Sequence, residues 1–176
     1  MPDAPGLELI AQEVNTRHEG AVLGTSFEHG QATLLVSGDS IVEVLTYLKE
    51  APGQEYDILS SLHGVDYLPA EPRFAVHYEL LNMPRVERLR VKALLPDPGG
   101  DELPELDSVY GVFPGADFQE REVYDFFGIL FRGHPDLRRI LMPEDYVGWP
   151  QRRDFPVGGE PVIFTNTEHT VPGWIR

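Results

Sequence analysis

Helical spacing of apolar residues predicts two amphipathic helices in the first third of the chain. The first covers about residues 7–19 and rests on the apolar positions Leu7, Ile10, Ala11 and Val14. The second begins after Ser40, which forms a possible capping box with Glu43, and it ends at Pro52. Its expected buried face consists of Ile41, Val44, Leu45 and Leu48. Both helices need a partner layer for these faces.

Strand patterns fill most of the sequence between and after these helices. Short apolar runs predict strands at residues 31–37 and 59–68, the latter broken near Gly64. Apolar and polar residues then alternate over residues 74–81 and 88–95, with a short turn between them, which predicts a β-hairpin with one face on a core. The other face of the hairpin carries a basic stripe that we expect to be solvated and partly paired with Glu79. The stripe consists of Arg88, Arg90 and Lys92.

A third helix is predicted over about residues 118–127, with Asp117 as its N-cap and Gly128 just after its end. Its apolar residues do not keep to one stripe, so we expect it to be covered on more than one side. On a helical projection Glu122 lies between Phe118 and Phe126. A carboxylate in such surroundings needs a cation, and we therefore expect Glu122 to be buried and paired with an arginine.

The pattern changes again at Pro143. Prolines and glycines recur too often for long regular elements, yet the segment is too apolar for a disordered tail. We therefore predict an α+β protein in which residues 1–142 form a two-layer domain, with a mixed β-sheet and packed helices. Residues 143–176 are expected to form an extended arm that docks on a surface.

Composition narrows the possible partners and cofactors. The formal net charge of −15 argues against nucleic acid, and the absence of cysteine removes disulfides and thiolate-bound metals or clusters. No apolar run is long enough for a membrane span, and no signal peptide is expected. Residues 132–153 nevertheless hold five arginines against three acids, which marks an electropositive segment in an acidic protein.

The candidates for catalysis or metal binding are weak. The carboxylates of Glu120, Glu122 and Asp125 are scattered around the predicted helix, and structural ion pairs are the favoured interpretation over acid–base catalysis. His77 and Glu79 share a strand face, which is only a weak ligand signal. We expect no catalytic, cofactor-binding or metal-binding residues in this chain. A co-chaperone function based on His134-Pro135-Asp136 is a further alternative, although a simple turn is favoured there.

The last third of the chain carries a set of residues at fixed spacing. They are Glu120-Arg121-Glu122, Asp125-Phe126-Phe127, His134, Arg138-Arg139-Ile140-Leu141 and Arg152-Arg153-Asp154-Phe155-Pro156. This motif resembles the signature of the C subunit of NADH-quinone oxidoreductase, respiratory complex I, and of the related J subunit of the plastid and cyanobacterial enzyme, and the resemblance covers about residues 55–165. Gly64-Val65-Asp66-Tyr67 and the strand after it also resemble the family. Gln119, Gln151 and Arg153 depart from the residues expected there.

The resemblance implies an accessory subunit without a cofactor, on the cytoplasmic face of the inner membrane as a peripheral part of the complex. It implies docking next to the D subunit, which forms the quinone site, and near subunits that hold flavin mononucleotide and iron–sulfur clusters. The residues expected to dock are Glu120, Arg121, Glu122, Asp125, Phe126, His134, Arg138, Arg139, Arg152, Arg153 and Asp154. The four arginines 138, 139, 152 and 153 are expected to contact carboxylates of a partner or of the third helix.

The alternatives within the same resemblance are a ferredoxin-dependent complex and a nickel–iron hydrogenase-type complex. A standalone acid–base enzyme is an alternative of another class. What co-purifies with the native chain would separate the first group, and turnover by the isolated chain would support the second.

Overall fold

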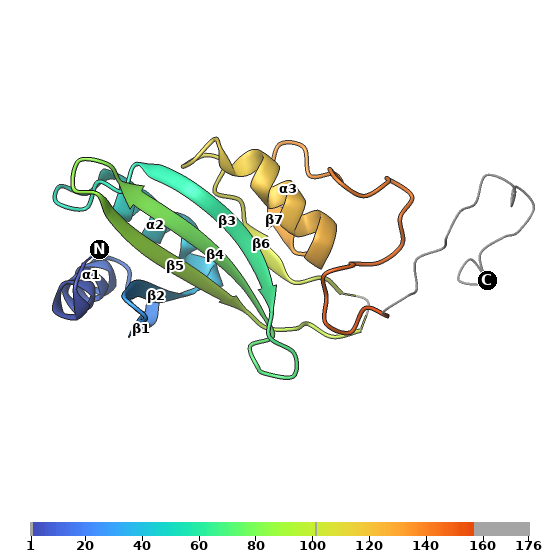
Figure 1. Ribbon diagram of the computed structural model, residues 1–176, viewed down its shortest axis with the longest axis horizontal. Helices are drawn as coiled ribbons and strands as arrows, with labels where there is room; N and C mark the ends of the chain where they lie inside the picture. Colours follow the sequence, from blue (N-terminus) through green and yellow to red (C-terminus); the bar gives the residue numbers. More distant parts are fainter. Residues whose placement is uncertain (1, 101, 157–176) are drawn as a thin grey trace, which may run out of the picture.

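The computed structural model describes residues 2–100 and 102–156, and it contains a five-stranded sheet with helices packed on it (Figure 1). The strand order is β1-β2-β5-β4-β3, and a separate two-stranded sheet pairs β6 with β7. The elements are α1 (Ala4–Arg17), β1 (Val22–Glu28), β2 (Gln31–Ser37), η1 (Gly38–Ser40), α2 (Ile41–Glu50), β3 (Ile58–Asp66), β4 (Phe74–Asn82), β5 (Glu87–Leu95), β6 (Glu105–Asp107), α3 (Ala116–Phe127) and β7 (Leu130–Arg132).

The five-stranded sheet is mixed, as predicted. Its β1–β2, β3–β4 and β4–β5 pairs are antiparallel, whereas β2 and β5 are parallel. The parallel pair arises because α2, β3 and β4 intervene before β5 joins β2. The predicted hairpin is confirmed as β4 and β5, in register from Phe74 opposite Leu95 to Asn82 opposite Glu87.

The main core lies between one face of this sheet and the helices. Alternate residues of β4 point into it, and the predicted apolar face of α2 is fully buried there. The core residues from these two elements are Phe74, Val76, Tyr78, Leu80, Ile41, Val44, Leu45 and Leu48. The alternate residues of β4 and β5 that do not point into the core face the other side of the sheet. On that side Arg90 forms an ion pair with Glu79, as expected.

The structure corrects several element boundaries. The third strand is not broken at Gly64, because β3 runs continuously from Ile58 to Asp66. A Cβ at Gly64 would lie 2.8 Å from Cδ2 of Phe127, so glycine here allows the close approach of α3. The first helix begins earlier than predicted, since Asp3 accepts a hydrogen bond from the Gly6 amide and caps it. Strands β1, β6 and β7 were not predicted.

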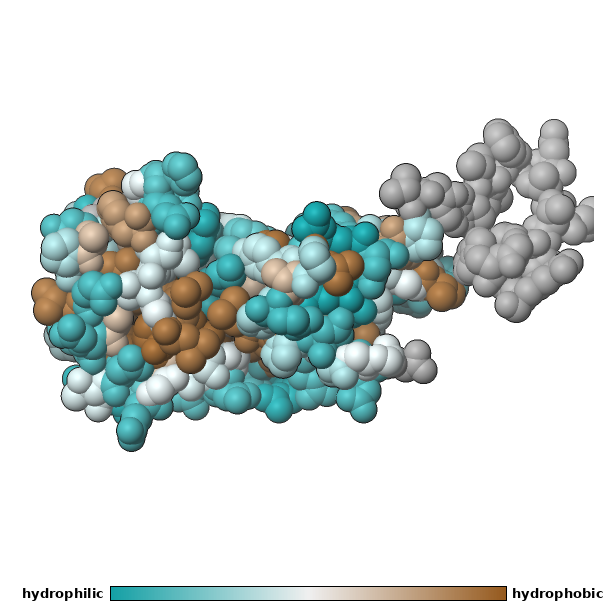
Figure 2. Space-filling model, turned by 90° about the horizontal axis from the view of Figure 1, so that it is seen from below, coloured by the Kyte–Doolittle hydropathy of each residue, from teal (hydrophilic) through white to brown (hydrophobic). Residues whose placement is uncertain are grey.

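Strand β1 forms one edge of the sheet and exposes two large apolar side chains, Leu23 and Phe27. Seen from below, the largest apolar areas lie in the half of the molecule that contains α1, β1 and β2 (Figure 2). Among the described residues, no helix is long and apolar enough to span a membrane.

Candidate docking surface

Helix α3 packs against β3 at the sheet edge opposite β1, and it organises the chain that follows it (Figure 1). The helix starts slightly earlier than predicted, with Gly115 rather than Asp117 as N-cap. The side chain of Asp117 instead contacts His134, with Oδ1 3.3 Å from Nε2 of the ring. The C-terminal prediction is confirmed, because Gly128 has a left-handed backbone with a φ of 69°.

Glu120 is fully buried and anchors the segment before α3. Its carboxylate accepts hydrogen bonds from Oγ of Ser108 at 2.6 Å and from the Val109 amide at 2.7 Å. The buried His134 ring lies close by, with Nε2 3.9 Å from the carboxylate. Burial raises the pKa of Glu120 to about 7, although the bonds from Ser108 and Val109 oppose the shift. Glu120 is therefore a buried carboxyl group with a structural role, since it holds Ser108 and Val109 of the same chain.

The raised pKa of Glu120 predicts a specific dependence of stability on pH. Between pH 4.5 and 7 the folded chain holds a proton on Glu120 that the unfolded chain has released, so stability falls as pH rises. The total loss expected from this group is about 3 kcal/mol. In Glu120→Gln this part of the loss should be absent, as measured by urea unfolding at pH 4.5 and pH 8. Equal pH dependence in both proteins would contradict the prediction.

Asp125 is also fully buried, and it fixes the loop after β7. Its Oδ2 accepts the amide hydrogens of Ile140, Leu141 and Met142 at 3.1, 2.7 and 2.8 Å. Its Oδ1 lies 2.8 Å from Nη1 of Arg139. Burial opposes ionisation, but these bonds outweigh it and hold the pKa of Asp125 below its usual value. The predicted contact between an arginine of this segment and a helix carboxylate is confirmed here.

Two arginines also bind the backbone of the same loop. Arg121 of α3 donates to the carbonyl oxygens of Arg138 and Arg139 at 3.2 and 3.3 Å. Arg139 donates in turn to the Gly148 carbonyl at 2.9 Å and lies 4.6 Å from the centre of the Trp149 ring. Arg138 itself is exposed and pairs with Asp136. Arg121, Arg138 and Arg139 therefore all bind groups of this same chain.

Residues 149–154 lie against this chain's own α3 and the neighbouring part of the sheet. Trp149 covers Gly128, where an added Cβ would approach its ring to 2.5 Å. Arg152 donates to the Phe127 carbonyl at 2.6 Å and its guanidinium lies near the rings of Phe74 and Trp149, at 5.0 and 5.8 Å. Arg152 thus binds a carbonyl and rings, and contacts none of the expected helix carboxylates. The remainder of the predicted arm, residues 157–176, lies outside the described residues.

The prediction for Glu122 is wrong. Its side chain is exposed, and no hydrogen bond or ion pair to it occurs within residues 2–100 and 102–156. Phe118, one turn earlier, is 63% exposed, while Phe126 is half-buried. The helical projection placed these residues together correctly, but this side of α3 faces away from the sheet.

A second buried network was missed by the sequence analysis. Arg73, immediately before β4, forms ion pairs with Asp66, Asp97 and Asp154 at 2.9, 2.8 and 2.8 Å. Asp66 also accepts the amide hydrogen of Arg153 at 2.9 Å. The available signal was the resemblance of Gly64-Val65-Asp66-Tyr67 to the family. This network holds Arg153 and Asp154 beside the sheet, although both residues are exposed.

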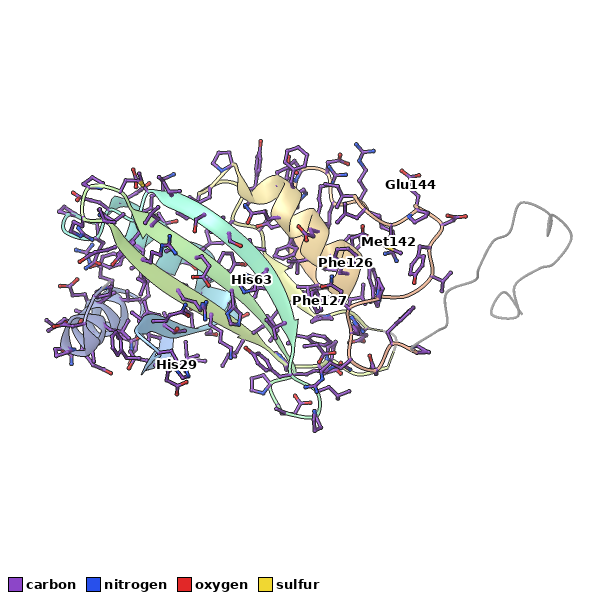
Figure 3. All side chains as sticks on the ribbon, viewed as in Figure 1. His29, His63, Phe126, Phe127, Met142 and Glu144 are labelled. Carbon is purple, nitrogen blue, oxygen red and sulfur yellow. The ribbon has the colours of Figure 1, made fainter. Side chains whose placement is uncertain are left out.

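The outer side of α3 and the loop after β7 form an exposed surface, and buried side chains hold the backbone beneath it in place. We call the outer side of α3 and the loop held by Asp125 the docking surface (Figure 3). Figure 3 shows Phe126 at the end of α3 with Met142 and Glu144 in the adjacent loop. The exposed residues of the docking surface include Phe118 (63%), Glu122, Leu141 (62%) and Val147 (67%). Large exposed apolar side chains gathered on one surface are typical of a protein–protein interface.

Comparisons with known proteins agree with the motif. The family model for the 30 Kd subunit of respiratory-chain NADH dehydrogenase matches residues 34–161. The C subunit of NADH-quinone oxidoreductase from Roseiflexus sp. (strain RS-1) is 44% identical over 146 residues, which cover 82% of this chain and 81% of that protein. The C subunit from Saccharopolyspora erythraea is 40% identical over 170 residues, covering 96% of this chain and 66% of that protein.

A solved structure shares the fold. It is a chain of the membrane-bound sulfane sulfur reductase, an archaeal respiratory membrane complex, with a TM-score of 0.67 and 25% identity over 85% of both chains. The match in sequence spans most of the sheet, α3 and the segment after it, which are the elements that build the docking surface. The chain therefore belongs to the family of the 30 Kd subunit of respiratory-chain NADH dehydrogenase, that is, the C subunit of NADH-quinone oxidoreductase.

Proposed function

We propose that this chain is an accessory structural subunit of the hydrophilic arm of a proton-translocating NADH-quinone oxidoreductase. It docks through the docking surface next to the D subunit, which forms the quinone site. Flavin mononucleotide and the iron–sulfur clusters reside in partner subunits, and the complex lies at the cytoplasmic face of the inner membrane. Neither a nucleic acid nor a membrane span of its own takes part.

The observation that carries the proposal is the contrast between the buried and the exposed side of α3. Glu120 and Asp125 point inward and hold backbone amides, whereas Phe118 and Glu122 point outward. A carboxylate that meets a substrate needs an open path, but Glu120 and Asp125 are both fully buried. Their arrangement supports a rigid platform for a partner rather than an acid–base enzyme.

A second candidate is the equivalent subunit of a complex with another electron donor or acceptor. The fold match to a chain of an archaeal sulfane sulfur reductase favours keeping this alternative. Native co-purification separates the two, since subunits that bind flavin and oxidise NADH are expected only with the first. Co-purification of ferredoxin-dependent or nickel–iron subunits would favour the second.

The docking surface predicts that Phe118→Asp blocks assembly without unfolding the free chain. Phe118 is 63% exposed, so its replacement costs the isolated chain less than about 0.5 kcal/mol. A charge buried at an interface centre instead costs several kcal/mol. We expect the fraction of assembled complex to fall at least about tenfold, measured by native gels and bound flavin, with normal turnover per complex that does assemble.

Val86→Asp is the matched control for this experiment. Val86 is 79% exposed in the β4–β5 turn, and its positive φ of 53° suits aspartate at least as well as valine. It should assemble like the wild type. Full assembly of Phe118→Asp, or equal defects in both variants, would reject the docking surface. Full assembly with lost turnover would favour a catalytic role for this region.

A further inference from the structure

The face of the sheet that points away from the core carries a compact group of metal-binding side chains. His63 of β3 and His77 of β4 lie directly opposite each other, with ring centres 5.0 Å apart. Glu79 is two residues further along β4 and shares their face. One ligand atom from each of the three residues lies within 4.8 Å of the others. Figure 3 labels His63 on the five-stranded sheet.

His77 is the unusual member of this group. The residue is only 7% exposed, and its Nδ1 has no hydrogen-bond partner among the described residues. Nε2 is 3.1 Å from the Tyr67 hydroxyl oxygen. A buried polar atom without a protein partner is rare, and ligand binding is one physical reason for it.

We propose that His63, His77 and Glu79 bind one divalent transition-metal ion of the Zn²⁺ class. Two neutral imidazoles and a carboxylate are a known ligand set for Zn²⁺, and they leave a coordination position for water. Tyr67 can accept the Nε2 proton of His77, which fixes the lone pair on Nδ1 and orients the ring. Tetrahedral ligand atoms are about 3.3 Å apart, so the side chains close in modestly on the ion.

Two cations on β5 compete with the metal. Arg90 forms an ion pair with Glu79, and Lys92 lies 4.1 Å from the centre of the Tyr67 ring. Both charges repel an incoming cation and lower its affinity. The site is therefore expected to bind at about micromolar concentrations rather than as tightly as a structural zinc site. Removal of Arg90 should strengthen binding, because it frees Glu79 and takes away one positive charge.

The experiment is a Zn²⁺ titration of the full chain after chelator treatment, followed by calorimetry, with the melting temperature as a second readout. We expect one ion per chain and a rise in melting temperature on binding. His63→Gln, at a half-exposed position, should weaken binding at least about tenfold, and Tyr67→Phe should weaken it by about tenfold through loss of ring orientation. Arg90→Gln should tighten it.

The matched control is His18→Gln, which removes a histidine beyond α1 that is not part of the group. It should bind Zn²⁺ like the wild type. No binding to the wild type, or unchanged binding in His63→Gln with a normal melting temperature before zinc is added, would overturn the proposal. Weaker binding in Arg90→Gln would likewise contradict it, because the loss of a positive charge beside the ion should strengthen binding.

Discussion

Asp125→Asn is expected to lower the free energy of unfolding by about 4 kcal/mol, because within the described part of the chain it removes the one carboxylate that pairs with the largely buried Arg139. One oxygen of Asp125 also accepts the loop amides of Ile140, Leu141 and Met142 while the other accepts from Arg139, so asparagine has to face two sets of donors. An asparagine amide can accept through one oxygen only, and its NH₂ group would face donors. Urea unfolding of the purified chain at pH 7 measures the change.

Glu122→Gln is the matched control on the same helix. Glu122 is exposed without an ion pair inside the described part of the chain, so the change should stay within about 0.5 kcal/mol. Hydrogen exchange adds a local readout, since the amides of residues 140–142 should lose protection in Asp125→Asn alone. If both variants are equally stable, the anchoring role of Asp125 is wrong.

Arg73→Met should have a similarly large effect, about 3–5 kcal/mol, by leaving Asp66 buried without its counter-ion. The side chain of Asp66 is only 1% exposed, and hydrogen bonds from Arg73, Leu68 and Arg153 outweigh its burial and lower its pKa to about 2. Methionine keeps much of the arginine volume. Thermal and urea unfolding of the isolated chain measure the loss.

A second substitution tests the cause. Adding Asp66→Asn to Arg73→Met removes the unpaired charge and keeps one of the two oxygens that accept the amide hydrogens of Leu68 and Arg153. The double variant should therefore be more stable than Arg73→Met alone. If it is less stable, the loss comes from packing of the Arg73 side chain over Phe74 rather than from the buried charge.

Periodicity was sufficient where a segment has one buried face. The hairpin at residues 74–95 and the apolar side of α2 were predicted correctly, because strict alternation and helical spacing each admit one burial pattern. The three-residue strands β6 and β7 carry too few residues for such a pattern. They form because the chain before α3 pairs with the chain after it.

Helix α3 shows where periodicity stops being informative. Apolar and charged residues of this helix are distributed around its whole circumference, so the sequence does not show which side packs against the sheet. The close approach of Phe127 to Gly64 decides the rotation of the helix. That rotation buries Glu120 and Asp125 and exposes Glu122, the opposite of the prediction for Glu122.

The α+β class, the main strands and helices, and the motif by which the family is recognised were all predictable from the sequence. These features depend on local spacing and residue identity, which the chain carries directly. Which polar side chains meet depends on the tertiary structure, because Arg73 pairs with Asp154 and His63 lies opposite His77 through contacts between segments that are separate in sequence. Burial makes the loss of one partner costly, and burial is a property of the packed molecule.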